Sequence, residues 1–147
     1  MKVILQSESA ECGLAALAMV ADHHGQHGGL AVLRQRFNLS LKGLRLDRLV
    51  QISQQIGFSA RAIRVELEEL GKLTTPCILH WDMNHFVVLK TVRASGIVIC
   101  DPAVGERKLS YREASEHFTG VVLELTPTAE LKPVKLSLIH ISDGARE

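Results

Sequence analysis

Three residues far apart in the 147-residue chain have the side chains that nucleophilic catalysis requires: Cys12, His85 and Asp101. A thiolate can attack a carbonyl carbon, an imidazole can act as its base, and a carboxylate can hold the imidazole in one orientation. Each residue also has an ordinary alternative: a small apolar side chain in a core, a surface histidine, and a turn aspartate before Pro102. The elements that carry the three residues decide between these interpretations.

Cys12 begins the run CGLAALAMVA, residues 12–21, which is apolar on every side and predicts a buried helix. A helix N-terminus carries partial positive charge and free N–H groups, and both favour a thiolate. Gly13 places no side chain beside the thiol, so we expect a substrate backbone to approach closely there. Cys77 and Cys100 lie in apolar, strand-like runs, and for them we expect a place in the core.

His85 and Asp101 lie at the ends of two predicted strands, residues 85–92 and 96–100. A turn at 93–96 would join the strands as a hairpin and bring His85 and Asp101 to the same end of the pair. We therefore expect the Asp101 carboxylate to accept a hydrogen bond from the Nδ1–H of His85. Gln6 is placed to donate to an oxyanion together with the Cys12 backbone N–H, although a lone glutamine is usually a solvated residue.

The other elements predict an α+β protein, with helices in the first half and an antiparallel sheet in the second. Further helices are expected at 30–37, at 44–56 with Gly57 as its end, at 66–70, and at 110–118 with Ser110 as its cap. Further strands are expected at 58–65, 77–81, 107–109 and 120–125. We predict one domain over residues 1–127 and a linker or tail over residues 128–147.

Bulk properties exclude several functions. The net charge is +1 and only 4% of residues are aromatic, which argues against nucleic acid as a partner. Three cysteines without a C-x-x-C pair predict neither a disulfide framework nor a structural zinc site, and they point to a reducing compartment. A metal site at Asp22, His23, His24 and His27 is a weak alternative, because glycines around these residues favour a loop.

Several separated motifs together resemble the N-terminal peptidase domain of bacteriocin-processing ABC transporters. They read QSESAECGLAALAM at 6–19, SLKGL at 40–44, ILHWDMNHFVVL at 78–89, IVICDPAVGERKLS at 97–110 and FTGVVLEL at 118–125. The resemblance covers roughly residues 3 to 126. It implies a papain-like fold, with N-terminal helices packed on a C-terminal antiparallel sheet. It also implies catalytic roles for Cys12, His85, Asp101 and Gln6. We predict no cofactor for the reaction, and the sequence leaves open whether an ion such as calcium supports folding or activity.

The same resemblance implies a substrate and a setting. Such domains cut the leader of a precursor peptide after a Gly-Gly pair, at the cytoplasmic face of the bacterial inner membrane. They work beside the membrane-spanning and ATP-binding domains of the transporter. His80 and Trp81 are candidates to line the cleft, with a structural role as the favoured alternative. A non-catalytic domain that only binds leaders is the competing function, and the presence of Cys12 and His85 argues against it.

Overall fold

The computed structural model describes residues 1–6, 9–37 and 44–131. A 3-10 turn, η1 (Ser9–Glu11), leads into the helices α1 (Cys12–His23), α2 (Gly29–Arg36) and α3 (Leu46–Ile56). The strands are β1 (Phe58–Arg64), β2 (Cys77–Trp81), β3 (His85–Arg93), β4 (Gly96–Asp101), β5 (Gly105–Ser110) and β6 (Phe118–Pro127). Between strands lie a second 3-10 helix, η2 (Leu67–Lys72), and the short α4 (Tyr111–Ser115).

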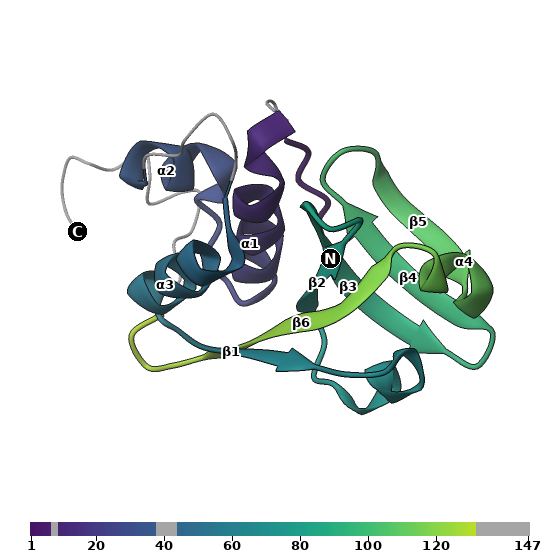
Figure 1. Ribbon diagram of the computed structural model, residues 1–147. Coiled ribbons are helices and arrows are strands. Elements are labelled where there is room, and N and C mark those ends of the chain that lie inside the picture. Colours follow the sequence, from purple (N-terminus) through teal and green to yellow (C-terminus); the bar gives the residue numbers. More distant parts are fainter. Residues whose placement is uncertain (7–8, 38–43, 132–147) are drawn as a thin grey trace, which may run out of the picture.

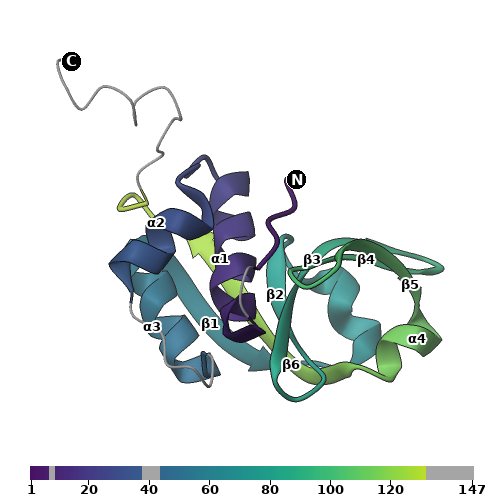
Figure 2. The same ribbon diagram turned by 90° about the horizontal axis from the view of Figure 1, so that it is seen from above.

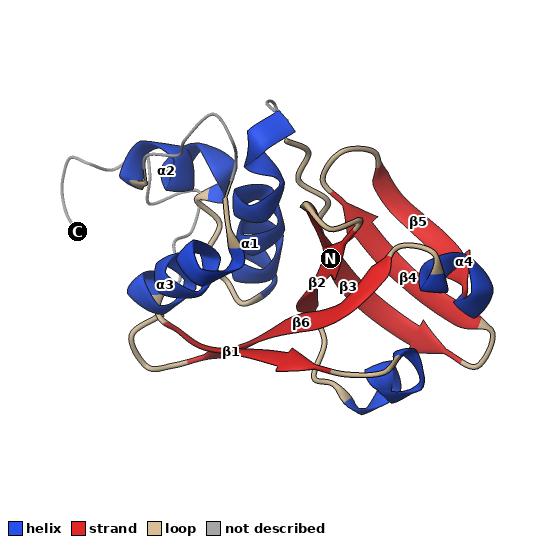
Figure 3. Ribbon diagram, in the orientation of Figure 1, coloured by secondary structure: helices blue, strands red, loops and turns tan. Residues whose placement is uncertain are grey.

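The strands form one antiparallel sheet in the order β1-β6-β2-β3-β4-β5. Figures 1 and 3 show α1, α2 and α3 gathered on one side, with β4, β5 and α4 on the other. Seen from above, β1 runs beneath the three helices (Figure 2). The predicted α+β class, with helices packed on an antiparallel sheet, is confirmed.

Helix α1 lies at the centre of a hydrophobic core between the helices and the sheet, which we call the first core. It can do so because residues 12–21 leave no polar side to turn toward water. Every residue from Cys12 to Ala21 is buried. The helix packs against α2 on one side and β3 on another, and alanines at 15, 16, 18 and 21 leave room for close approach. This burial fixes the start of α1, and therefore Cys12, at the junction of the helices and the sheet.

The central strands of the sheet are buried on both faces, while the edge strands β1 and β5 are largely exposed. Because side chains alternate along a strand, Ile78 of β2 joins the core beneath α1 while Leu79 and Trp81 join a second core. Leu70 of η2 and Ala114 of α4 belong to that second core. Trp81, only 1% exposed, is thus a structural residue of this second core.

Capping and turn residues in the sequence correctly predicted where several helices begin or end. Gly57 ends α3 in the left-handed region, with φ 116°, and Ser110 and Glu113 form the expected capping box of α4. The helix expected at 66–70 is instead a 3-10 helix at 67–72. The helix expected at 110–118 ends at Ser115, because Phe118 already pairs with Trp81 in the sheet.

After β6 the chain packs back on the end of α3. The backbone N–H of Thr128 donates to the Gly57 carbonyl oxygen over 3.0 Å, and Leu131 is buried. Residues 132–147 of the predicted linker, residues 40–43 of the SLKGL motif and residues 7–8 lie outside the described parts. Within the described parts, no helix is both long enough and apolar enough to cross a membrane.

Candidate active site

The fold brings Cys12, His85 and Asp101 together. Cys12 is the first residue of α1, His85 the first of β3 and Asp101 the last of β4. The β3–β4 hairpin turns between Arg93 and Gly96, as expected. The His85 Nε2 atom lies 2.6 Å from the Asp101 Oδ1 atom, and the Cys12 side chain lies near enough to the same ring to raise the pKa of His85. The arrangement is a thiol, an imidazole and a carboxylate in series.

The ring nitrogen that faces the carboxylate differs from our expectation. Asp101 contacts Nε2 of His85, and not Nδ1. An imidazole offers one nitrogen on each side, so the Asp101 contact leaves Nδ1 for the thiol. We attribute this orientation to the place of Asp101 at the end of β4, the strand paired with β3, where its carboxylate meets the outer nitrogen of the ring.

The neighbours of His85, Asp101 above all, keep its ring positively charged at neutral pH. Hydrogen bonds to Asp101 and to Cys12 raise the pKa of His85 to about 10, against the opposing effect of burial. Burial would raise the pKa of Asp101, but hydrogen bonds from His85 and from the Ala103 N–H outweigh it and lower that pKa. The site therefore places a positively charged imidazolium beside Cys12, which is the setting that a cysteine nucleophile requires.

The N-terminal segment is attached to the turn that follows Asp101. The backbone N–H of Gln6 donates to the Pro102 carbonyl oxygen over 2.9 Å, and the Gln6 Oε1 atom is buried. Figure 1 shows this segment running between the start of α1 and the β4–β5 turn. The backbone of Gln6 is thereby tied to the turn that directly follows Asp101.

The turn before His85 has a strained backbone at two residues and is held by hydrogen bonds to His117. Asp82 and Met83 have φ values of 51° and 67°, a region that residues other than glycine rarely adopt. Asp82 Oδ1 lies 2.7 Å from His117 Nδ1, and the Asp82 N–H donates to the His117 carbonyl oxygen. His117 also stacks on Trp81. Sequence reasoning missed His117, because 35 residues separate it from Asp82.

His80 precedes this turn and is held by a neighbouring strand. Its Nδ1 atom lies 2.8 Å from the hydroxyl oxygen of Thr119, and its ring packs near Phe86. These contacts favour the structural role for His80 that the sequence also favoured.

The expectation for Gly13 was wrong. A Cβ atom at Gly13 would lie 3.0 Å from the Cδ2 atom of Leu44 and 3.4 Å from that of Phe86. The space beside Gly13 is filled by core side chains and is not open to a substrate. The glycine is needed so that Leu44 and Phe86 can pack against the first turn of α1.

The two other cysteines are core residues, as predicted. Cys77 and Cys100 are fully buried. Burial, followed by the nearby Glu124 charge, raises the pKa of Cys77 to about 12. Burial, followed by Glu106, also raises the pKa of Cys100. Both therefore remain neutral thiols under conditions in which a cysteine peptidase works.

The histidines after α1 do not form the helical pair that a metal site would need. Helix α1 ends at His23, and His27 lies beyond it with its Nδ1 atom 2.6 Å from Asp22 Oδ1. His24 packs edge-on against His23 and Phe58. Over residues 1–6, 9–37 and 44–131 there is no group of three or more His, Cys, Asp or Glu side chains that could hold a metal ion.

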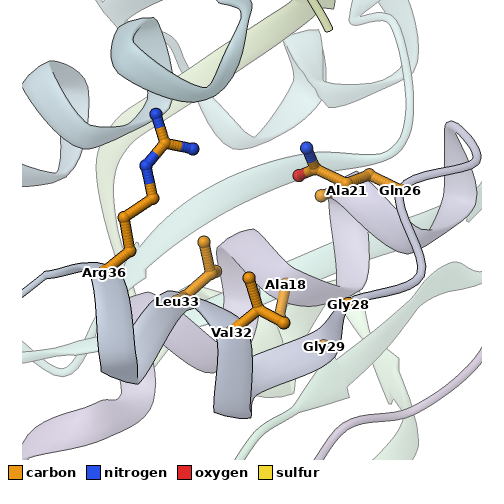
Figure 4. Close-up of a pocket in the computed structure, with 8 residues that line it drawn as sticks. All are labelled: Ala18, Ala21, Gln26, Gly28, Gly29, Val32, Leu33 and Arg36. Carbon is orange, nitrogen blue, oxygen red and sulfur yellow. The ribbon is translucent and has the colours of Figure 1, made fainter. Parts of the chain in front are cut away.

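A cavity of about 110 Å³ lies between α1 and α2. Figure 4 shows its lining, with Arg36 and Gln26 on opposite sides of it. The lining residues are Ala18, Ala21, Gln26, Gly28, Gly29, Val32, Leu33 and Arg36. None of the four candidate catalytic residues contributes to this cavity, so it is separate from the site at the start of α1.

Comparison with known proteins shows the family of the chain. Residues 1–130 match the model of the Peptidase C39 family. The chain is 50% identical over 130 residues to the colicin V secretion/processing ATP-binding protein CvaB of Escherichia coli, covering 88% of this chain and 19% of the relative. It is 48% identical over 140 residues to the probable microcin-H47 secretion/processing ATP-binding protein MchF of the same species, covering 92% and 20%. The chain thus spans about a fifth of the length of these relatives.

Two solved structures share the fold. One is a double glycine motif protease from an AMS/PCAT transporter in complex with the leader peptide, with a TM-score of 0.81, 38% identity and coverage of 86% of this chain and 91% of that one. The other is the peptidase domain of Streptococcus ComA, with a TM-score of 0.79, 27% identity and coverage of 86% and 98%. The resemblance seen in the sequence is confirmed: the chain belongs to the Peptidase C39 family of cysteine peptidases and has its papain-like fold.

Proposed function

We propose that this chain cuts leader peptides directly after a Gly-Gly pair, with Cys12 as nucleophile, His85 as base and Asp101 as the residue that orients His85. The observation that carries the proposal is the meeting of Cys12, His85 and Asp101 at the start of α1, the start of β3 and the end of β4, with 2.6 Å between the His85 ring and the Asp101 carboxylate. The start of α1 supplies the positive end of a helix dipole, which favours a negatively charged intermediate.

Each step uses a group that the site provides. The Cys12 thiolate attacks the carbonyl carbon of the second glycine, and the resulting oxyanion accepts hydrogen bonds from the Cys12 N–H and the Gln6 side-chain amide. The C–N bond breaks as His85 gives its proton to the leaving amine. Water, deprotonated by His85, then attacks the thioester and releases the leader as a carboxylate, which restores the thiol–imidazole pair.

The substrate and setting follow from the relatives. Two relatives about five times as long as this chain are named secretion/processing ATP-binding proteins, and one solved structural neighbour is named a double glycine motif protease with a bound leader peptide. We infer that residues 1–127 form the peptidase unit of a peptide exporter, and that residues 128–147 lead to its membrane-spanning and ATP-binding domains. The precursor would then meet the site at the cytoplasmic face of the bacterial inner membrane.

A synthetic precursor tests this specificity. We expect one cut, directly after the second glycine, when the products are mapped by mass spectrometry. Replacing either glycine of the pair by alanine should lower kcat/KM about 10–100-fold, because one added methyl group in a narrow cleft costs that much discrimination. Tight binding of the precursor by the folded chain with no cutting would contradict the proposal and assign a docking role.

The Gln6 side chain has a separate test. Gln6→Ala should lower kcat about 10²–10³-fold with little change in KM, because the lost donor serves the oxyanion and not the bound substrate. The matched control is Gln54→Ala, at an exposed position on α3. Steady-state kinetics with the Gly-Gly precursor decide, and a variant that raises KM alone would place Gln6 in substrate binding.

A further inference from the structure

Glu11, the residue directly before the nucleophile, is a buried carboxylate. It closes η1 and is only 4% exposed. A buried charge is costly unless a partner neutralises it. Arg34 of α2 supplies that partner: its Nη2 atom lies 3.0 Å from Glu11 Oε1, and its Nε atom 2.5 Å from Glu11 Oε2. A guanidinium that meets both carboxylate oxygens fixes direction as well as charge.

We propose that Arg34 is a positioning residue for the peptidase reaction and that it acts on Cys12 through Glu11. The inference rests on the proposed role of Cys12 as nucleophile. A negative charge on Glu11, one residue from the thiolate, would oppose the charged form of the thiol and weaken the favourable field at the start of α1. The Arg34 guanidinium cancels that charge where it arises.

The pair also ties the start of α1 to a second helix. Arg34 lies 23 residues after Glu11 in the sequence, on the helix that packs against α1. The first turn of α1 contains the Cys12 N–H that would hold the oxyanion, so the contact fixes the direction of this N–H. The charged groups placed around Cys12 are then His85 of β3, Asp101 beyond it on β4, and the Glu11–Arg34 pair of η1 and α2.

Arg34 could act by neutralising the Glu11 charge or by linking the start of α1 to α2. Three variants of the full chain separate these two effects: Arg34→Gln, Glu11→Gln, and the double variant. The first leaves an uncancelled carboxylate, the second removes the carboxylate charge but keeps its shape, and the third makes the pair neutral. Arg36→Gln is the matched control, because Arg36 lies on the same helix and donates to the Gln55 carbonyl oxygen instead. Two readouts are compared: kcat and KM with the Gly-Gly precursor, and the pH dependence of Cys12 alkylation by iodoacetamide, followed by mass spectrometry.

We expect an asymmetric result. Arg34→Gln should lower kcat about tenfold with KM unchanged, and should move the midpoint of Cys12 alkylation up by about one pH unit, as expected for one added charge near the thiolate. Glu11→Gln should leave the midpoint no higher than in the wild type. The double variant should restore the midpoint and most of kcat, and Arg36→Gln should match the wild type.

Two results would overturn the inference. One is a folded Arg34→Gln variant with the wild-type alkylation curve. The other is an equal loss of kcat in all three variants, which would make the pair a tether alone. If Arg34→Gln does not fold, a folded double variant decides: wild-type alkylation and kcat support the inference, and a tenfold loss overturns it. The Cys12→Ala variant tests the proposed function separately. If that variant still cleaves the precursor, the proposed function fails, whatever the Arg34 variants show.

Discussion

Replacing Cys12 by alanine is expected to lower kcat by at least about 10⁴-fold, the largest effect of any single substitution in this chain. The reason is chemical: without the thiolate no acyl-enzyme forms, and only the oxyanion donors and substrate binding remain to help water. Binding of the Gly-Gly precursor should persist, because alanine removes one sulfur atom and leaves the surrounding core intact. Steady-state and single-turnover cleavage, together with a binding measurement, test both parts.

The other two cysteines provide the control for this experiment. Cys77→Ala and Cys100→Ala each remove a fully buried thiol from the sheet, so they should lower the free energy of unfolding while kcat stays near the wild-type value. Iodoacetamide should label Cys12 selectively in the native chain, because burial keeps the pKa values of the other two raised. Cleavage that persists in Cys12→Ala but is lost in either control would require a different nucleophile.

Local sequence patterns predicted the elements that carry the site. The all-apolar run after Cys12 indicated a buried helix, because such a run has no side to expose. Two β-branched runs separated by a short turn indicated the hairpin that joins His85 to Asp101, and the side-chain period of two fixed which residues reach each core. These are properties of neighbouring residues, so one sequence is enough to read them.

The parts that the sequence could not supply are contacts between distant segments. The hydrogen bond from Gln6 to Pro102, the pairing of Glu11 with Arg34, and the clamp of His117 on Asp82 all join elements that only the packed fold brings together. No periodicity encodes them, since each depends on how helices and sheet are placed relative to one another.

The use of Gly13 and the choice of ring nitrogen on His85 were misjudged for the same reason. Both depend on what lies beside α1 once it packs. Leu44 and Phe86 fill the space next to Gly13, and the place of Asp101 at the end of β4 brings its carboxylate to Nε2 of His85.

Asp101→Asn is expected to have the second largest effect. An asparagine side chain can accept one hydrogen bond from His85, but it carries no negative charge and offers an amide that can turn its donor toward the ring. By analogy with the loss of the orienting carboxylate in a catalytic triad, kcat should fall by about 10²–10⁴-fold. Asp47→Asn, at an exposed position on α3, is the matched control and should leave kcat unchanged.

The pH dependence gives this prediction a second readout. The folded-state pKa of His85 lies at about 10, above its ordinary value of 6.5, so its stabilising contribution is complete below pH 6.5 and is lost as pH rises toward 10. The pKa of Asp101 is lowered from 3.8, so its contribution is present above pH 3.8 and is lost as pH falls through the lowered value. Asp101→Asn should remove the Asp101 contribution, lower the His85 contribution, and so flatten the pH profile of the unfolding free energy.

The same sign applies to catalysis. The reactive pair contains protonated His85, so activity in the wild type should persist until pH approaches 10 and fall above it. In Asp101→Asn the largest cause of the raised His85 pKa is gone, and the alkaline limit of kcat should move to lower pH. A variant that loses kcat but keeps the wild-type alkaline limit would show that Asp101 supports the fold without governing the charge of His85. Because the Asp101 carboxylate both fixes the ring and holds its proton, kcat and its alkaline limit should change together.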